Sequence, residues 1–517
     1  METFINRSGA RLFFAFIAGL SLVPAMSPWG LWPFMFAGFS LFYIALDRAR
    51  SGREALLSGA LFGFGFHLLG LWWIGNALLV PGNESYRWAW PLAVAGLPLL
   101  LSVFTAVAAV LSWRAGRLST SAPGRFFLFT ALFGLAEWLR GHILTGFPWN
   151  LYGYGWTHLW AIAQLAAPIG IYSLTTITIF WAGFPGFLTL WNASFARKAL
   201  FFGLVAASFA AAYGYGVSRL AAPEKDDAEK NAVVLLLVQP NIAQAEKWDP
   251  ARARENLDTL LSLSESRPGE DKPGHTTVVI WPETAIHTGF LRDEQAVAAI
   301  RRVLAGYPGP VYLMTGLLRA EKEGYYNSLV VYDRELFPLA VYNKSHLVPF
   351  GEYIPFQELF SFGPVTGFEG FSAGRGPETA TVLDLPPFSP LVCYEVIFPG
   401  AVVEKGPRRP KWIVNVTNDA WYGDSPGPYQ HFSTARFRAL EEGVPVVRVA
   451  NTGVSGVIDS KGRVVAQTDL LREERATVAL PFSVEKTSLY GWIRSISFVF
   501  VLSFFFLLYF TTFGRIK

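Results

Sequence analysis

The sequence predicts a multi-span α-helical membrane protein that also carries an α/β domain outside the cytoplasm. Apolar segments fill residues 1–217 and 488–517, whereas the residues between them carry an ordinary share of charge. The chain of 517 residues is 52% hydrophobic and only 16% charged, although soluble domains carry about 25% charged residues. Bulk disorder is excluded, because disordered chains contain few aromatic residues and this chain is 16% aromatic.

Eight apolar segments are long enough, or nearly so, to cross a bilayer. No Asp, Glu, Lys or Arg occurs between Arg11 and Asp47, and one helix over that stretch would exceed a bilayer core of about 30 Å. A turn signal at Ser27–Gly30 divides it, and the first part also has the features of a signal peptide. The predicted spans are about Leu12–Ala25, Leu31–Leu46, Leu56–Leu79, Ala89–Trp113, Phe126–Leu139, Trp160–Leu190, Leu200–Val217 and Ser495–Phe513.

Positive charge sets the predicted orientation of these spans. With the N-terminus inside, the short outer loops keep only Arg87 and Arg140. An even number of spans then places both termini in the cytoplasm and the α/β domain, residues 218–487, outside. The residues collected on the cytoplasmic side are Arg7, Arg11, Arg48, Arg50, Arg53, Arg114, Arg117, Arg125, Arg197, Lys198, Arg515 and Lys517.

Strand and helix patterns alternate within residues 218–487, which indicates an α/β domain with one core. Amphipathic patterns at Ala251–Ser264 and Asp293–Ala305 predict helices. Strands are predicted from short apolar or β-branched runs bounded by turn residues. These runs are Val233–Val238, Thr277–Trp281, Val311–Thr315, Ser328–Tyr332, Leu391–Cys393 and Trp412–Val416.

Charge and cysteine content exclude several classes of protein. The net charge of +4 is spread thinly and forms no basic cluster for nucleic acid. With one cysteine, Cys393, the chain forms no internal disulfide and no thiolate zinc cluster. A lone cysteine is usually a small buried hydrophobe. Cys393, however, stands where a strand meets a loop, a common place for active-site groups.

A cysteine nucleophile requires a base and a donor for the oxyanion. Histidine is the usual base, but His275, His287, His346 and His431 have no helpful spacing. A carboxylate is the alternative, and Glu283 directly follows the strand at Val278–Ile280; it could equally be a helix-start charge. Lys344 also follows a strand, although an isolated lysine is usually a surface charge.

Taken together, three segments resemble the nitrilase, or carbon–nitrogen hydrolase, superfamily. They are Trp281–Ala285 (WPETA), Asn343–Glu352 (NKSHLVPFGE) and Val392–Glu395 (VCYE), in that order. With seven spans before the domain and one after it, the whole chain resembles the apolipoprotein N-acyltransferase family. Two stretches are specific to that branch: Leu347–Pro355, and Glu137–Arg140 with Gly146–Trp149. Glu137 and Arg140, three residues apart on one helix face, are either a functional or a structural pair.

The resemblance implies an αββα sandwich and a Glu–Lys–Cys triad. Glu283 would be the general base and Cys393 the nucleophile, while Lys344 and the main-chain N–H of Tyr394 would stabilise the oxyanion. Lys344 is also expected to lower the pKa of the thiol. The resemblance further implies that Glu352 orients Lys344 or assists proton transfer, that Tyr394 and Glu395 support activity, and that Trp248 contributes to substrate binding.

The implied reaction is a ping-pong acyl transfer in the bacterial inner membrane. The donor would be a phospholipid, the sn-1 chain of phosphatidylethanolamine, and the acceptor the α-amine of an S-diacylglyceryl-cysteine in an apolipoprotein. No cofactor, metal or nucleic acid is expected, and the protein is expected to act as a monomer. The segment Phe356–Pro377 is expected to be a mobile lid at the outer leaflet, in which Phe362 and Phe368, with Phe360 and Phe371, contact lipid; the alternative is an ordinary surface loop.

Two other classes of function remain open at this point. A membrane-tethered amidase or nitrilase would use the same triad on a small substrate with water as acceptor. Its tether would need only one helix, so the large set of spans favours lipid substrates. A transporter with an accessory domain would need charges within its spans, and these are nearly absent from the sequence.

Overall fold

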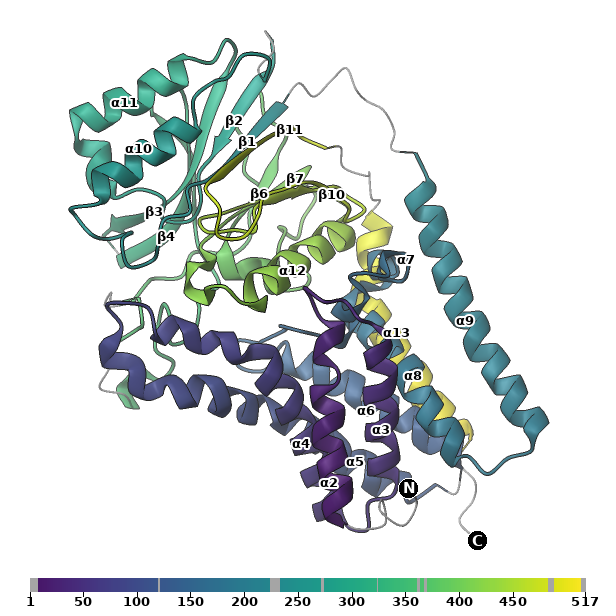
Figure 1. The fold of residues 1–517 in the computed structure, drawn as a ribbon. Helices are drawn as coiled ribbons and strands as arrows, with labels where there is room; N and C mark the ends of the chain where they lie inside the picture. Colours follow the sequence, from purple (N-terminus) through teal and green to yellow (C-terminus); the bar gives the residue numbers. More distant parts are fainter. Residues whose placement is uncertain are drawn as a thin grey trace. The chain divides into compact units, whose positions relative to one another are not determined.

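The chain forms two compact units from segments that alternate along the sequence (Figure 1). The computed structural model describes residues 8–119, 121–223, 233–270, 274–322, 324–359, 363–366, 370–481 and 488–512. The helical unit comprises Met1–Gly75, Ala89–Ala222 and Lys486–Lys517. The α/β unit comprises Asn76–Trp88 and Pro223–Glu485. The short segment Asn76–Trp88, at the end of the third apolar stretch, therefore packs with the α/β unit.

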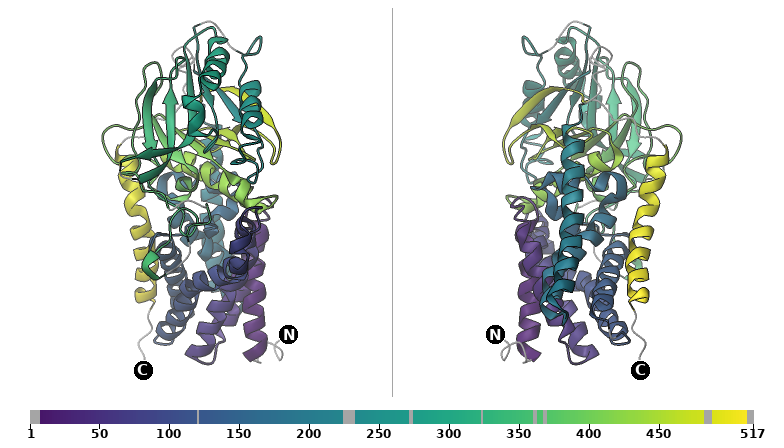
Figure 2. Two further views of the ribbon diagram at one scale, coloured as in Figure 1. Left: turned by 90° about the vertical axis from the view of Figure 1, so that its left-hand side faces the viewer. Right: turned by 90° about the vertical axis from the view of Figure 1, so that its right-hand side faces the viewer.

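The helical unit is built from helices that, apart from one helix of four residues, are long and run alongside one another (Figure 1, Figure 2). They are α2 (Ser8–Leu20), α3 (Pro33–Asp47), α4 (Gly52–Leu71), α5 (Leu97–Gly116), α6 (Ala122–Arg140), α7 (Trp160–Ala163), α8 (Ala166–Leu190), α9 (Phe195–Ala221) and α13 (Ser488–Thr511). Helix α4 packs against α2 and α5, while α8 packs against α3, α6 and α13.

Small residues allow α4 and α5 to approach closely, as is common between membrane helices. A Cβ atom at Gly59 would lie 2.5 Å from the Cβ of Ala109 and 2.5 Å from the carbonyl oxygen of Thr105. The hydroxyl of Thr105 donates to the carbonyl oxygen of Gly59 at 2.9 Å. The two backbones are thus in direct contact at this point.

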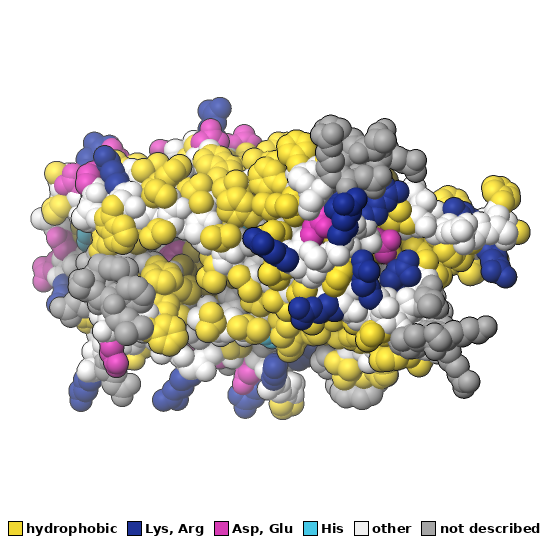
Figure 3. Space-filling view, turned by 90° about the horizontal axis from the view of Figure 1, so that it is seen from below, with side chains coloured by type: hydrophobic (Ala, Val, Ile, Leu, Met, Phe, Trp, Pro, Cys, Tyr) yellow, Lys and Arg dark blue, Asp and Glu magenta, His cyan; other side chains and the backbone are white. Residues whose placement is uncertain are grey.

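Five helical segments are long and apolar enough to cross a membrane, counted over the described residues: Ser8–Ala25, Gly52–Leu78, Glu84–Gly116, Ala166–Leu190 and Phe195–Ala221. Pro33–Asp47 and Ile496–Thr511 are apolar but shorter. Large hydrophobic side chains such as Leu99, Leu100 and Leu204 are more than half exposed. Figure 3 likewise shows hydrophobic side chains over much of one face, with Lys and Arg side chains gathered on part of it. The membrane character predicted from the sequence is therefore confirmed.

Arg140 and Glu137, the ionisable pair of the sequence motif, form an internal structural pair. Arg140 donates to the two carboxylate oxygens of Glu137 at 3.1 and 2.7 Å. It also donates to the main-chain carbonyls of Phe147 and Trp149 at 2.6 and 2.9 Å. Because both side chains are buried, the pair closes the loop that follows α6.

The α/β unit contains two sheets, as Figure 1 shows. The first has the strand order β11-β1-β2-β3-β4-β5 and the second β10-β9-β8-β7-β6. Strands β1, β2 and β3 are parallel to one another, as are β6, β7 and β8. The bounds are β1 (Val233–Gln239), β2 (Thr276–Ile280), β3 (Val311–Glu321), β4 (Gly324–Tyr332), β5 (Pro338–Asn343), β6 (Phe388–Val392), β7 (Trp412–Thr417), β8 (Val446–Ala450), β9 (Gly456–Ile458), β10 (Val464–Gln467) and β11 (Glu474–Ala479).

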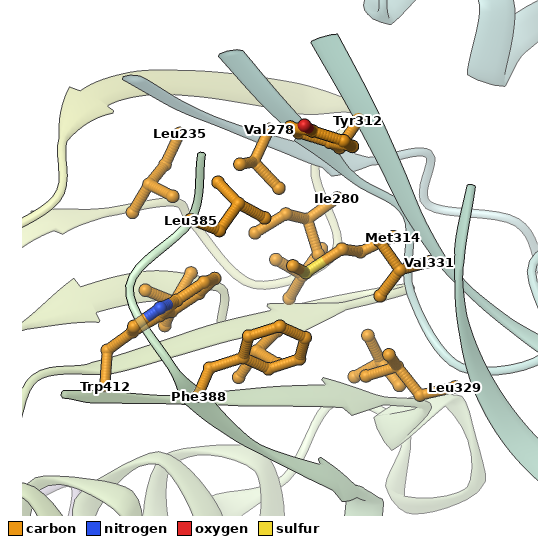
Figure 4. Packing of buried hydrophobic residues seen from close by; sticks show 14 of the residues in the cluster. Leu235, Val278, Ile280, Tyr312, Met314, Leu329, Val331, Leu385, Phe388 and Trp412 are labelled. Carbon is orange, nitrogen blue, oxygen red and sulfur yellow. The ribbon is translucent and has the colours of Figure 1, made fainter. Parts of the chain in front are cut away.

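The main core lies between the two sheets, where side chains of both interdigitate (Figure 4). Leu235 and Leu237 of β1 point into this core, whereas Leu236 and Val238 pack beneath α10 (Ala253–Leu263) and α11 (Glu294–Ala305) on the outer face. Strand β1 is buried on both faces, which explains its continuous apolar run. Helix α12 (Pro426–Glu442) packs against β8, so the layers are helix, sheet, sheet and helix.

The predicted α/β domain is confirmed, and so are its six predicted strand runs and two predicted helices. Two strand ends differ: β2 stops at Ile280, one residue before Trp281, and β6 stops at Val392, where Cys393 begins the short helical turn η8 (Cys393–Ile397). Of β5 the sequence patterns predicted only its end before Lys344, without bounds, and they missed β8, β9, β10, β11 and α12.

Candidate active site

Three segments that follow strands bring the predicted triad together within the α/β unit. Glu283 lies three residues after β2, and Lys344 directly follows β5 in the same sheet. Cys393 directly follows β6, which belongs to the other sheet. The site therefore receives groups from both sheets of the sandwich.

Lys344 is the electrostatic centre of this cluster. Its Nζ lies 2.8 Å from Oε1 of Glu352 and 3.8 Å from Oε1 of Glu283. The Lys344 side chain is 1% exposed. Burial lowers the pKa of its ammonium, but the two carboxylates and the nearby thiol outweigh that effect and raise the pKa above the ordinary value. Lys344 is therefore a permanent cation in the site.

Asn327 of β4 bridges the carboxylates of Glu283 and Glu352. Its Nδ2 donates to Oε1 of Glu283 at 2.7 Å and to Oε1 of Glu352 at 3.2 Å. The other carboxylate oxygen of Glu352 accepts a hydrogen bond from the main-chain N–H of Val348 at 2.8 Å. Each oxygen of Glu352 thus has a hydrogen-bond donor, so the carboxylate is fixed in position.

Cys393 has a backbone conformation that side-chain-bearing residues seldom adopt. Its φ is +52°, and such angles at a non-glycine residue persist only where the surroundings enforce them. Asn415 of β7 donates to the carbonyl oxygen of Cys393 at 3.2 Å. The sharp turn between β6 and η8 therefore presents a buried thiol at the strand end.

Glu395 ties the cysteine turn to the segment that carries Lys344. One of its oxygens accepts hydrogen bonds from the Tyr342 hydroxyl at 2.7 Å and from the main-chain N–H of Ser345 at 2.8 Å. The other accepts from the main-chain N–H of Val392 at 2.7 Å. Lys344 and Cys393 each adjoin a residue held by this carboxylate, so Glu395 fixes their separation.

The thiol of Cys393 is protonated at neutral pH. Burial raises its pKa, and the Glu283 carboxylate raises it further. The Lys344 ammonium and a hydrogen bond from the Asn418 main chain lower the pKa, but it remains well above the ordinary thiol value. Lys344 thus lowers the pKa of the thiol, as the sequence predicts, but burial and the Glu283 carboxylate raise it by more. Because the thiol is a poor nucleophile, attack requires a base that takes its proton.

Of the candidate histidines, His431 lies against the main chain of Cys393, and His346 stacks on Phe398 just after the cysteine turn. Nδ1 of His431 is 2.9 Å from Oδ1 of Asp419, and Arg448 donates to the other oxygen of Asp419. All three side chains are fully buried, and the His431 ring lies against the main chain of Cys393. Burial lowers the pKa of His431, while Arg448 and His431 hold the pKa of Asp419 below its usual range. This network supports the turn beneath the nucleophile.

The remaining predicted residues lie around the cluster or outside the described residues. Trp248 packs edge-on against His287, with ring centroids 4.7 Å apart. Tyr394 is buried and packs edge-on against Phe398 at 5.0 Å. Phe362 and Phe368 lie outside the described residues, as does Phe360. Within the described ranges, no group of three or more His, Cys, Asp or Glu side chains could hold a metal ion.

Two residues of the site were missed by sequence reasoning, Asn327 and Lys247. Asn327 interrupts an otherwise apolar strand, which is a weak signal for a buried polar role. Lys247 precedes Trp248 and donates from Nζ to the main-chain carbonyl of Glu283 at 2.8 Å. It is only 5% exposed, and no sequence signal distinguishes it from a surface lysine.

Comparisons with known proteins agree with this organisation. Residues 18–184 match the apolipoprotein N-acyltransferase N-terminal domain, and residues 237–487 match the carbon–nitrogen hydrolase family. An apolipoprotein N-acyltransferase of Allorhizobium ampelinum is 39% identical over 92% of this chain and 91% of its own length. That of Brucella melitensis is 39% identical over 89% of this chain and 88% of its own length. A protein of the same name from Rhodopseudomonas palustris is 36% identical over 92% of this chain and 90% of its own length.

Alkylation of Cys393 tests the electrostatic balance at the thiol. Iodoacetamide should react slowly at about pH 7.5 and faster as pH rises, because only the thiolate reacts. Glu283→Gln removes a charge that raises the thiol pKa, so it should speed alkylation at fixed pH by about 3- to 10-fold. Lys344→Met should slow alkylation by a similar factor. Intact-protein mass spectrometry over time gives the rates.

The exposed carboxylate of Glu335 provides the control, since Glu335→Gln changes the net charge equally. It should leave the alkylation rate unchanged. Equal rates in Glu283→Gln and Lys344→Met would contradict the described balance of charges.

Proposed function

The chain belongs to the family of apolipoprotein N-acyltransferases, and from this premise we propose that it transfers a fatty acyl chain from a membrane phospholipid to the N-terminal α-amine of an apolipoprotein. The donor is the sn-1 ester of phosphatidylethanolamine, and the acceptor is an S-diacylglyceryl-cysteine. The observation that carries the proposal is the buried cluster in which Lys344 contacts Glu283 and Glu352 beside the Cys393 thiol.

The first half-reaction forms a thioester on Cys393. Glu283 takes the thiol proton as Sγ attacks the ester carbonyl, and the oxyanion is stabilised by the Lys344 ammonium and the main-chain N–H of Tyr394. The bond from the carbonyl carbon to the glycerol oxygen then breaks. The leaving oxygen receives the proton from Glu283, and a lysophospholipid departs.

The second half-reaction transfers the acyl chain to nitrogen. The acceptor amine attacks the thioester carbonyl, and Glu283 takes the proton that the amine loses. When the bond between carbon and Sγ breaks, the thiolate regains a proton from Glu283, and the product is an amide. No cofactor is required, because the triad supplies base, nucleophile and oxyanion donor.

Other residues orient the triad or contact substrate. Glu352 orients Lys344, and Glu395 fixes the turn that carries Cys393. Trp248, close to the Glu283 segment, contacts substrate together with Phe362 and Phe368 of the proposed lid. The aromatic side chains of that lid suit contact with acyl chains.

For the membrane arrangement we propose eight spans in a monomer, with both termini in the cytoplasm. Seven spans lie in residues 1–217 and one in residues 488–517, so residues 218–487 face the periplasm. The excess of Lys and Arg in the loops assigned to the cytoplasm supports this orientation. Lipid substrates then meet the triad at the outer surface of the inner membrane.

Mass spectrometry of a lipoprotein N-terminus tests the function. Purified protein, phosphatidylethanolamine and a diacylglyceryl peptide should give a peptide heavier by one fatty acyl group, with release of one lysophospholipid. Cys393→Ala should give neither product. No acyl gain by wild type, together with ammonia release from a small amide, would instead identify an amidase.

Single-cysteine labelling tests the orientation, because Cys393 is the one native cysteine. In a Cys393→Ala background, an impermeant maleimide should label Lys405→Cys in intact spheroplasts. Arg197→Cys, in the first turn of α9, should be labelled only after lysis. Both positions are exposed, so labelling of Arg197→Cys before lysis would overturn the proposed orientation.

A further inference from the structure

A second lysine, Lys247, is buried beside the base of the triad. It lies in the segment after β1, is 5% exposed, and donates from Nζ to the main-chain carbonyl of Glu283 at 2.8 Å. Lysines are almost never buried unless their charge is compensated. The proposed catalytic scheme of base, nucleophile and oxyanion donor assigns no task to it.

The site contains two carboxylates, Glu283 and Glu352, around the single ammonium of Lys344, so a second cation would balance their charge. Lys344 is closer to Glu352 than to Glu283 by 1.0 Å (3.8 against 2.8 Å). Glu283 is otherwise held by Asn327, which is a neutral donor. Both Glu283 and Cys393 act electrostatically on Lys247, so its ammonium lies close to the base and to the nucleophile.

The turn that carries Glu283 is clamped from its other side by Gly316 of β3. A Cβ atom at Gly316 would lie 2.5 Å from the Cα of Glu283. The main-chain N–H of Gly316 donates to the carbonyl of Pro282 at 3.1 Å, and its carbonyl accepts from Ala285 at 2.9 Å. Thr284 has a φ of +47°, which requires support from the surroundings. Lys247 supplies such support by donating a hydrogen bond to the main-chain carbonyl of Glu283, the residue before Thr284.

We propose that Lys247 is a positioning residue for the general base. Its ammonium holds the main-chain carbonyl of Glu283 and places a second positive charge, besides that of Lys344, close to Glu283 and Cys393. This inference rests on the proposed function, because it assigns Lys247 a task in the first half-reaction. Lys247 itself contacts no reacting atom.

The charge of Lys247 is lost within an accessible pH range. Burial lowers the pKa of its ammonium to about 8, although Glu283 and Cys393 pull in the opposite direction. The positive form is therefore complete below that pH and lost above it. Of the other charged or titratable groups nearby, the Nζ of Lys344 lies 3.8 Å from Oε1 of Glu283, and Nε2 of His287 lies 3.1 Å from the main-chain oxygen of Lys247. Thioester formation should accordingly decline above about pH 8 in the wild type.

Single-turnover release of lysophospholipid, without acceptor, tests the inference on the full-length protein with phosphatidylethanolamine. Lys247→Met removes both charge and donor and should slow the release by about 10- to 100-fold at neutral pH. It should also abolish the alkaline decline. Lys247→Gln keeps an N–H donor without charge, so its rate should be intermediate and should likewise lack that decline.

Lys461 offers a matched control, since it is a lysine of similar burial (4% exposed) in the turn between β9 and β10. Lys461→Met should keep the wild-type pH profile. If Lys247→Met and Lys247→Gln keep both the wild-type rate and its alkaline decline, the inference is overturned and the proposed function stands. If the wild type itself releases no lysophospholipid, the result contradicts the proposed function, and with it the role of Lys247 that rests on that function.

Discussion

The ammonium of Lys344, buried between two carboxylates, is the interaction on which the site depends. Removing a charge from water costs several kcal/mol, and only close partners of opposite sign offset that cost. Glu352 at 2.8 Å and Glu283 at 3.8 Å provide them. Asn327 and the N–H of Val348 also donate hydrogen bonds to these carboxylates. Burial of the cluster limits the access of water, which the proposed thioester intermediate must avoid.

The same burial that strengthens these ion pairs keeps the thiol of Cys393 protonated. The two effects fit together in one mechanism. In the proposed mechanism the thiol ionises only when Glu283 accepts its proton, so it is inert until substrate arrives, and the charge of Lys344 awaits the oxyanion. The two-sheet sandwich makes this possible, because it brings together strand ends from separate sheets. Glu395 joins them across the gap through Tyr342, Ser345 and Val392.

Much of this arrangement could be predicted from the sequence, since Glu283, Lys344 and Cys393 each stand at the end of a recognisable apolar run. Other features could not. Strand β10 is only four residues long and largely exposed, β11 is half-buried and begins with charged residues, and α12 buries polar residues such as His431 and Arg438. Asn327 and Lys247 reach Glu283 from 44 and 36 residues away. Such roles arise from tertiary contacts; the local sequence gives at most a weak signal for Asn327 and none for Lys247.

In the proposed mechanism the acyl chain passes through Cys393, and intact-protein mass spectrometry can detect it there. The protein is incubated with phosphatidylethanolamine of defined acyl chains and no acceptor, then quenched in acid. We predict a gain of one sn-1 acyl group, mapped to Cys393 and removed by hydroxylamine or by added acceptor peptide. Acylation of the peptide without an acyl-protein, or by Cys393→Ala, would contradict the mechanism.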